Sequence, residues 1–491
     1  MSDLQVFDEI HVVSDIHMGG KPGFQILRQT DRLANFIRWV GAQRPDGQVA
    51  LVLNGDVIDT LAEDVAGYVA IDDATTIVAR IMDDPAFRGV WAAMADFVKL
   101  DGRKLVIVLG NHDIELAFPP VQRLLLSRLA AGDLLARARI EFSTAGAGYA
   151  CSVGGARIYC IHGNEVDPWN YNRYEDLAKV SRRLNAGRSI EQSEWKPNAG
   201  TKMVKEVMNA VKRKYAWIDL LKPETAAAVG TLLVLDPTQA QKITQLFGIV
   251  GERKSGSAEV DQRLSTEGFQ APAPAGVQAL GMEQILGPSL RQAVAHDTDD
   301  MLLAAERNFA VPGTGMPGGD QQLGTGQLIW ERLTGWITGV GKEEALRRAL
   351  VDWLEGDPTF KIDDPDDTYK QVSASVGSAV DFIVTGHTHL ERAIDMGGRY
   401  YFNTGTWIRL LRLTEGMLRN TESFKEIYSV LVDGRMETID KATPGGEPFV
   451  LDQTSSVSIK AEGGGVVGCL NHVVGDGSGA PQEIARFVKA P

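Results

Sequence analysis

The stretch that decides the fold is VVSDIHMGG at residues 12–20, where an apolar run stops on two potential metal ligands, Asp15 and His17. The run VFDEIHVVSD (6–15) reads as a β-strand because apolar side chains dominate it. Two residues spaced by two in an extended chain project to the same side. The stretch therefore predicts a strand whose carboxyl end presents two ligands together.

The same arrangement recurs further along the chain, where other apparent strands also end on metal-binding residue types. These stretches supply Asp56 and Asp59 (NGDVID), Asn111, His112 and Asp113 (GNHD), His162 (IHGNEVD), and His387 and His389 (VTGHTH). The chain has 8 histidines, and five of them lie in these stretches and the opening one. Clustering at carboxyl ends of strands is typical of functional sites in open α/β sheets. Adjacent glycines, Gly55, Gly110, Gly163 and Gly386, are expected to let the backbone turn and approach an ion.

The ligand types restrict the metal. Mixed Asp, Asn and His ligands suit Mn, Fe, Zn or Co and argue against calcium, which prefers oxygen alone. Seven such side chains are too many for one tetrahedral ion, so they suit two ions that share a carboxylate, roughly 3.5–4 Å apart. Each residue alone also has an ordinary interpretation as a turn, cap or buried polar residue, but these interpretations would all have to hold together and in order.

The first third of the chain alternates between strand and helix patterns. QVALVLNGD (48–56) and KLVIVLGNHD (104–113) read as strands, whereas residues 23–43 and 74–100 have apolar residues at helical spacing. This alternation predicts a mainly parallel, buried sheet, followed by a hairpin over 138–162.

The remainder is organised differently. Residues 168–376 read as mostly helical, with a Gly/Pro-rich loop at 311–327. Short strands are expected again over 379–407 and 426–440, and no regular pattern follows from 441. The predicted division is a core at 1–167 and 378–440, a helical cap insertion at 168–377, and a C-terminal extension at 441–491.

The ordered series D-x-H, GD, GNHD, HG and GHTH resembles the calcineurin-like metallophosphoesterases over about residues 8–167 and 378–440. The resemblance implies an α/β fold, a four-layer β-sandwich flanked by helices with a two-metal site between the sheets. It places Asp15, His17, Asp56 and His389 on one metal. It places Asp56, Asn111, His162 and His387 on the other, so that Asp56 bridges the two.

The resemblance also implies a hydrolase. Two divalent ions, with Mn the first choice, would lower the pKa of a bridging water so that hydroxide attacks phosphorus. By resemblance, His112 contacts the phosphoryl oxygen or leaving group without binding metal, and Asp113 orients His112. Asp59 is interpreted as a local hydrogen-bonding or helix-capping residue.

The insertion allows two interpretations of the substrate. Its apolar residues either form the core of the cap or line a cleft for a lipid-linked substrate: Trp195, Tyr215, Trp217, Leu220, Leu221, Leu232, Leu233, Leu235 and Phe247. The UDP-2,3-diacylglucosamine pyrophosphatases are similar in combining this core with a helical cap. They carry Arg where His112 stands and Asp where Asn164 stands, which favours the broader family. Arg173, Arg182 and Arg183 could hold a second phosphate or form a solvated helix face.

Composition and net charge limit which partners and which location we expect for the chain. The net charge of -14 and pI near 5.2 disfavour extended nucleic-acid binding. Three cysteines and the lack of a basic, apolar leader suggest a cytoplasmic protein, and no apolar run reaches the roughly 20 residues of a membrane span. We therefore expect a phosphodiesterase or pyrophosphatase for a small or amphipathic substrate. The alternatives are a phosphomonoesterase, a nuclease of the same superfamily and a noncatalytic scaffold.

Overall fold

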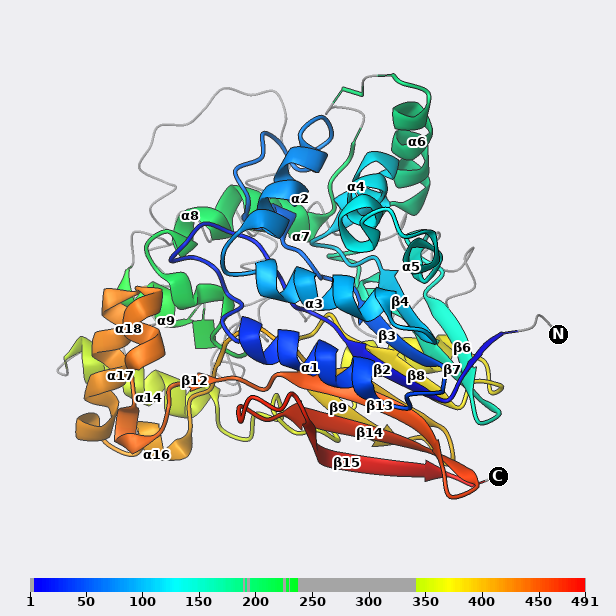
Figure 1. Cartoon of the computed structure of the whole chain (residues 1–491). Coiled ribbons are helices and arrows are strands. Elements are labelled where there is room, and N and C mark those ends of the chain that lie inside the picture. Colours follow the sequence, from blue (N-terminus) through cyan, green and yellow to red (C-terminus); the bar gives the residue numbers. More distant parts are fainter. Residues whose placement is uncertain are drawn as a thin grey trace.

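The computed structural model describes residues 4–188, 190–191, 195–223, 227–228, 230–236 and 341–490. Two large β-sheets pack face to face, and helices cover their outer faces (Figure 1). The strand orders are β15-β14-β13-β2-β3-β4-β5 in the seven-stranded sheet and β1-β6-β7-β8-β10-β9 in the six-stranded sheet. This arrangement confirms the expected α/β sandwich.

The strands that build the sandwich are β1 Gln5–Phe7, β2 Glu9–Val13, β3 Val49–Asn54, β4 Arg103–Val108, β5 Ile140–Ser143, β6 Tyr149–Val153, β7 Ala156–Cys160, β8 Phe382–Thr385, β9 Glu391–Asp395, β10 Tyr400–Thr404, β13 Ser455–Glu462, β14 Gly465–Val473 and β15 Pro481–Lys489. A separate two-stranded ribbon pairs β11 Leu410–Leu411 with β12 Val450–Leu451.

Strands β2 to β5 form the predicted parallel part of the larger sheet. Val12 pairs with Val52, which pairs with Val106 on the next strand. The strands are buried on both faces, which accounts for their nearly continuous apolar sequence. The predicted hairpin is also present, since β6 and β7 pair antiparallel in the other sheet.

The C-terminal residues correct the expectation of an extension without pattern. β13 pairs antiparallel with β2, β14 with β13, and β15 with β14, so that residues 455–489 complete the larger sheet. The glycines that obscured the pattern sit in the turns at Gly463 and Gly464, both at positive φ, and inside β14 at Gly468. A side chain at Gly468 would collide with Phe382 and Phe402 across the sandwich, so the sheet packing itself requires this glycine.

The longer helices are α1 Thr30–Ala42, α2 Ala74–Asp83, α3 Arg88–Lys99, α4 Pro119–Ala130, α6 Tyr174–Asn185, α14 Lys342–Trp353, α15 Asp367–Ser375 and α17 Thr421–Asp433. The shorter ones are α5 Leu134–Ala138, α7 Ala199–Lys202, α8 Asn209–Lys212, α9 Gly230–Leu235, α16 Glu415–Leu418 and α18 Met436–Lys441. Helices α1 to α5 pack their apolar faces on the outer face of the seven-stranded sheet, and α15 packs on the other sheet. Among the described residues, no helix combines the length and apolarity needed to cross a membrane.

A second hydrophobic core lies beside the sandwich. It joins the 3₁₀ helix Ala216–Asp219, α9 and α14 of the insertion to α16, α17 and α18 (Figure 1). Trp217 is fully buried there, and its indole N–H donates to the carbonyl of Leu431. The insertion and the helices after residue 411 therefore share one core.

The expected strand at 426–440 is wrong, because α17 and α18 occupy this region. Phe424, Ile427, Val430 and Leu431 recur at helical spacing and are buried on one face. Asn420 caps the start of α17, and Gly434 ends it in the left-handed conformation. The β-branched residues within the segment suggested a strand, but the caps and the spacing of the apolar side chains decided the structure.

The core interpretation of the insertion's apolar residues is confirmed where they are described. Trp195 packs against the helices over the larger sheet. Five residues lie in the second core, with Leu235 packed against it: Tyr215, Trp217, Leu220, Leu221 and Leu232. Phe247, the side chain of Leu233 and the Gly/Pro-rich stretch 311–327 lie outside the described residues.

Candidate metal centre

The residues predicted from the sequence converge between the two sheets, beyond the carboxyl ends of five strands. Asp15 and His17 follow β2, Asp56 follows β3, and Asn111 follows β4 in the larger sheet. His162 follows β7, and His387 and His389 follow β8 in the smaller sheet. Strands β7 and β8 are parallel neighbours, which is how a segment more than 200 residues later returns to the same place.

The backbone that presents these side chains is not extended, which corrects the expected geometry. Five of the residues adopt the left-handed region: Asp15 (φ 53°), His17 (50°), Asp56 (52°), His387 (71°) and His389 (62°). Non-glycine residues rarely adopt this region, and such strain clusters at functional sites. The loops after β2 and β3 support each other, since the amides of Asp15 and His17 donate to the carbonyls of Gly55 and Asp56.

Two glycines make room for the cluster. A Cβ at Gly110 would collide with the Asp56 carboxylate, and a Cβ at Gly55 would collide with the ring of His162. Gly55 also has a φ of 90°, which side chains disfavour. These contacts explain why glycine precedes Asp56 and Asn111.

Asp15, His17 and His389 form the first group, with ligand atoms within 4.8 Å of one another. The Nε2 atoms of His17 and His389 are 3.1 Å apart, and His389 Nε2 lies 3.3 Å from Asp15 Oδ1. The other oxygen of Asp15 accepts hydrogen bonds from the Ser14 hydroxyl and the amide of His387.

Asp56, His162 and His387 form the second group. His162 donates from Nδ1 to the carbonyl of Asn54 at 2.7 Å, so its Nε2 is left facing Asp56 Oδ2 at 3.3 Å. The same oxygen lies 3.7 Å from Nε2 of His17 in the first group. Although burial raises the pKa of Asp56, the surrounding histidines His162, His112 and His17 hold it well below its usual value.

The donor set fits divalent metal ions. Buried polar atoms normally find a hydrogen-bond partner, yet Asp15 Oδ1, Asn111 Oδ1 and His162 Nε2 are buried without one. Carboxylate, amide and imidazole donors together match the preferences of first-row divalent metals.

His112 lies beside the groups, and its carboxylate partner is not the one expected. Nδ1 of His112 is 3.2 Å from Oδ1 of Asp59, and Oδ2 of Asp59 is 3.6 Å from Nδ1 of His17. The Asp113 carboxylate instead accepts from the backbone amides of Val57 and Gly110, so the expected role of Asp113 in orienting His112 is wrong. Asp59 does cap the 3₁₀ helix at Thr60–Ala62, as predicted, but it also contacts both histidines.

Nearby charges and burial shift the pKa values of His112 and Asp113. Burial lowers the pKa of His112, but the carboxylates of Asp59 and Asp56 outweigh burial and raise the pKa to about 9. Burial and the charge of Asp56 raise the pKa of Asp113 to about 8. The carboxylates therefore favour a protonated His112, whereas burial and the charge of Asp56 disfavour ionisation of Asp113.

The insertion places two buried lysines near the histidines, which the sequence did not single out. Lys212 of α8 forms a buried ion pair with Asp219, and its charge reaches His112 and Asp59. Burial lowers the pKa of His389 to about 4, and the Lys222 ammonium adds to this effect. Asp167 is also new, since its carboxylate lies 2.9 Å from Nε2 of His387. No spacing rule in the sequence indicated any of these three.

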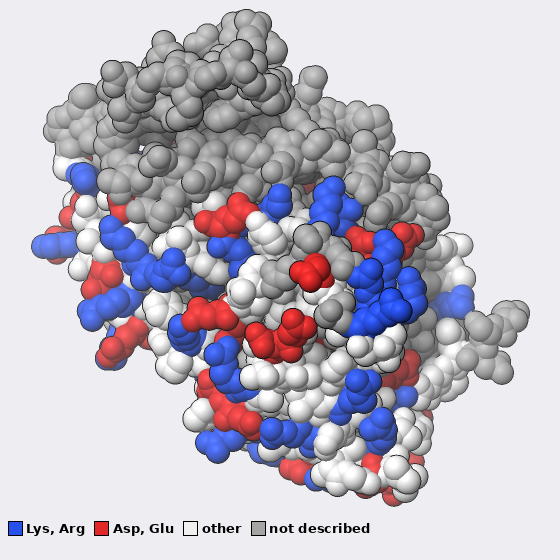
Figure 2. Space-filling view, turned by 90° about the horizontal axis from the view of Figure 1, so that it is seen from above, with Lys and Arg blue, Asp and Glu red and all other residues white. Residues whose placement is uncertain are grey.

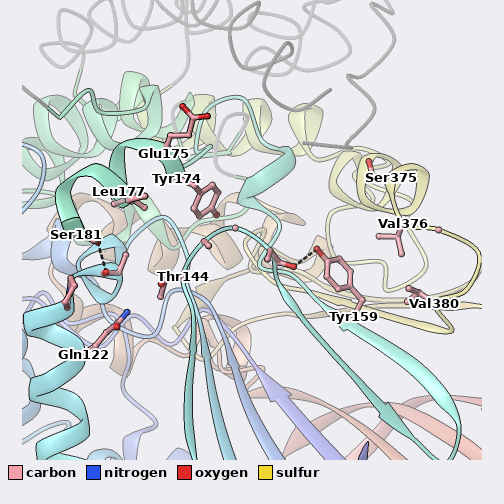
Figure 3. A pocket seen from close by; sticks show the side chains of 17 residues that line it. Gln122, Thr144, Tyr159, Tyr174, Glu175, Leu177, Ser181, Ser375, Val376 and Val380 are labelled. Carbon is pink, nitrogen blue, oxygen red and sulfur yellow. Dashed lines mark hydrogen bonds between the residues drawn. The ribbon is translucent and has the colours of Figure 1, made fainter. Parts of the chain in front are cut away.

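A separate groove of about 980 Å³ opens between α4, α6, the turn before β6 and the segment before β8 (Figure 3). Tyr159, Tyr174, Glu175 and Ser375 line it together with small apolar residues, and none of the candidate ligands does. Tyr174 connects the groove to the His162 loop, because its hydroxyl donates to Glu165 at 3.3 Å.

Basic side chains do not converge on the metal groups from α6. Arg182 and Arg183 on this helix are exposed, which supports their interpretation as a solvated face, and Arg173 is half-buried. Figure 2 shows blue and red side chains interspersed over the face seen from above, with one denser basic group on the right.

Comparison with known proteins supports the resemblance over the first part of the core and the start of the insertion. Residues 9–212 match the family model described as calcineurin-like phosphoesterase. A comparison with curated proteins finds no match.

Proposed function

We propose that this chain, whose residues 9–212 match the calcineurin-like phosphoesterase family, is a phosphoester hydrolase that works with two divalent ions on a small or amphipathic phosphodiester or pyrophosphate. One observation carries the two-ion proposal. Oδ2 of Asp56 lies within 3.7 Å of His17 Nε2 and 3.3 Å of His162 Nε2, so a single carboxylate faces both groups.

The proposed ligand sets extend the two groups, since the family resemblance adds Asp56 to the first and Asn111 to the second. Asp15, His17, Asp56 and His389 would hold one ion, and Asp56, Asn111, His162 and His387 the other. When bound, such ions activate a water as nucleophile and polarise the phosphoryl oxygens. We favour Mn among Mn, Fe, Zn and Co because hard carboxylate and amide oxygens balance the imidazoles.

The side chains around the groups have complementary roles. The Asp59 carboxylate accepts from Nδ1 of His112, and its charge raises the pKa of the ring. Nε2 of His112 is then the donor to a phosphoryl oxygen or a leaving oxygen. Asp113 fixes the loop through two backbone amides.

Lysines of the insertion lie near the proposed metal centre and affect its charge. Lys222 brings positive charge towards His389, whereas the charge of Lys212 is largely offset by its ion pair with Asp219. The charge of Lys222 attracts a phosphorylated molecule and opposes the repulsion expected from a net charge of -14. The core packing of Trp217, Leu220 and Leu221 removes these side chains from any lipid-binding role.

The alternatives predict other behaviour. A nuclease would bind extended phosphate backbones, which the net charge of the chain disfavours. A noncatalytic scaffold would not need every ligand, whereas all seven proposed ligand residues are present. The three cysteines are free and buried, which supports our proposal of a reducing, cytoplasmic location.

The test is turnover of bis(p-nitrophenyl) phosphate against p-nitrophenyl phosphate by Mn²⁺-loaded protein. Preference for the diester supports the phosphodiesterase or pyrophosphatase proposal. Preference for the monoester would replace it with the phosphomonoesterase alternative. No turnover of either substrate with two ions bound would favour the scaffold.

A further inference from the structure

Asp167 lies outside the sequence motifs, yet its carboxylate contacts one of the proposed ligands. We propose that Asp167 is a positioning residue that holds a proton on Nε2 of His387, so that His387 offers Nδ1 to an ion. This inference rests on the proposed metal centre and adds to it which ring nitrogen binds and which residue decides it.

Three hydrogen bonds fix the orientation of the Asp167 carboxylate. Oδ2 accepts from His387 Nε2 at 2.9 Å and from the Asn170 amide at 2.6 Å, and Oδ1 accepts from the backbone amide of Trp169 at 2.8 Å. An ionised carboxylate only accepts hydrogen bonds, so the partner nitrogen of His387 must carry the proton. Asp167 belongs to none of the candidate metal groups among the described residues and contacts His387 through the ring nitrogen, so we assign it the role of orienting His387.

The other three proposed histidine ligands face their groups through Nε2. His162 donates from Nδ1 to Asn54, which leaves Nε2 toward Asp56. His17 and His389 approach each other through Nε2 at 3.1 Å. His387 is therefore the exception, since its Nε2 is turned to Asp167 and only Nδ1 remains for the group of Asp56 and His162.

The loop that carries Asp167 is itself fixed. The Asn164 amide donates to the carbonyl of Asn170, and the Asn172 amide donates to the carbonyl of Gly110 beside Asn111. The amide of Gly200 in α7 donates to the carbonyl of Trp169. The first residues of the insertion thus connect the loops after β4, β7 and β8.

The experiment compares full-length Asp167→Ala and Asp167→Asn with wild type. Asp133→Ala is the matched control, because Asp133 also accepts two backbone amide hydrogens, at the start of α5, but contacts no histidine. The first readout is Mn²⁺ and Zn²⁺ binding in competition with a chelator. Outer partners of histidine ligands typically contribute 10–100-fold to metal affinity.

We expect Asp167→Ala to lower the affinity for one of the two ions about 10–100-fold. Asp167→Asn should restore part of the lost affinity, and Asp133→Ala should leave the affinity for both ions unchanged. The second readout is the long-range ¹H–¹⁵N spectrum of Zn²⁺-loaded protein labelled with ¹⁵N-histidine. Wild type should show one zinc-bound ring with a protonated Nε2, and this signature should change in Asp167→Ala.

Two results would overturn the inference: unchanged affinity for both ions in Asp167→Ala, or zinc binding by all four rings through Nε2. A third result would be that both Asp167→Ala and Asp167→Asn lose one ion while wild type lacks the Nε2–H signature. Asp167 would then be a ligand, and the inference would be overturned. Failure of the metal-centre proposal is distinct, because wild type itself would then bind no ions.

Discussion

The carboxylate of Asp59 lies 3.2 Å from Nδ1 of His112, although Asp113 is the neighbour of His112 in the chain. Histidine is oriented here by a residue from another loop, three positions beyond Asp56. This contact places Asp59 in the proposed site in addition to its role as a helix cap.

Asp59→Asn should reduce kcat about 10–100-fold in metal-loaded protein, because an amide does not stabilise the cationic ring of His112. Asn preserves helix capping, so the fold should be retained. Steady-state kinetics on an aryl phosphodiester measure the effect. Asp133→Asn, which alters a cap remote from the site, should keep wild-type kcat. Equal kcat in the two variants would refute the role of Asp59.

Gly110→Ala should abolish turnover and weaken metal binding, because the added Cβ would displace the Asp56 carboxylate. Gly89→Ala in α3 is the control, since nothing lies within 4 Å of its Cβ position. There, alanine should stabilise the helix by up to about 1 kcal/mol. The measurements are metal content and thermal unfolding. Normal metal content in Gly110→Ala would show that the Asp56 loop tolerates the shift.

Removing metal should lower the midpoint of thermal unfolding. Asp15 and Asp56 repel each other, and unpartnered buried atoms remain at Asn111 and His162. Ions at about 100 times their Kd would contribute about 2.7 kcal/mol. The midpoint should therefore fall with chelator in wild type but not in Asp56→Asn. An equal response of both proteins would place the stabilising ions elsewhere.

Trp217→Ala should destabilise the second core by about 3–5 kcal/mol, because the side chain is fully buried and its N–H is bonded to Leu431. Amide hydrogen exchange should then increase together in the 3₁₀ helix Ala216–Asp219 and in α17. Leu134→Ala, at a side chain that is 78% exposed, should change stability by less than about 0.5 kcal/mol. Faster exchange in the insertion alone would contradict a shared core.

The motif residues were predictable because their type and order are visible in the sequence, and so were the parallel strands β2 to β5. The left-handed backbone at Asp15 and His387 was not, since it arises from hydrogen bonds between loops. Likewise, Asp167 is five residues beyond His162, and only the folded structure brings it to His387.

The errors at the C-terminal end have a different origin. The segment 426–440 contains β-branched residues in a helix that Asn420 and Gly434 delimit. The residues after 441 contain glycines in turns and at Gly468, where two aromatic rings leave no room for a side chain. At 426–440 the caps and the helical spacing outweighed the strand propensity of the β-branched residues, and after 441 the packing between the sheets outweighed the glycine content.

We propose that one carboxylate, Asp56, joins two metal groups into a hydrolytic centre. Mn²⁺ titration of metal-free wild type and Asp56→Asn, with bound metal and aryl phosphodiester turnover followed in the same samples, tests it most directly. We predict that the wild-type chain binds two ions and that turnover rises with their occupancy. Asp56→Asn should lose both metal binding and turnover. Wild-type turnover by Asp56→Asn, or by protein without metal, would contradict it.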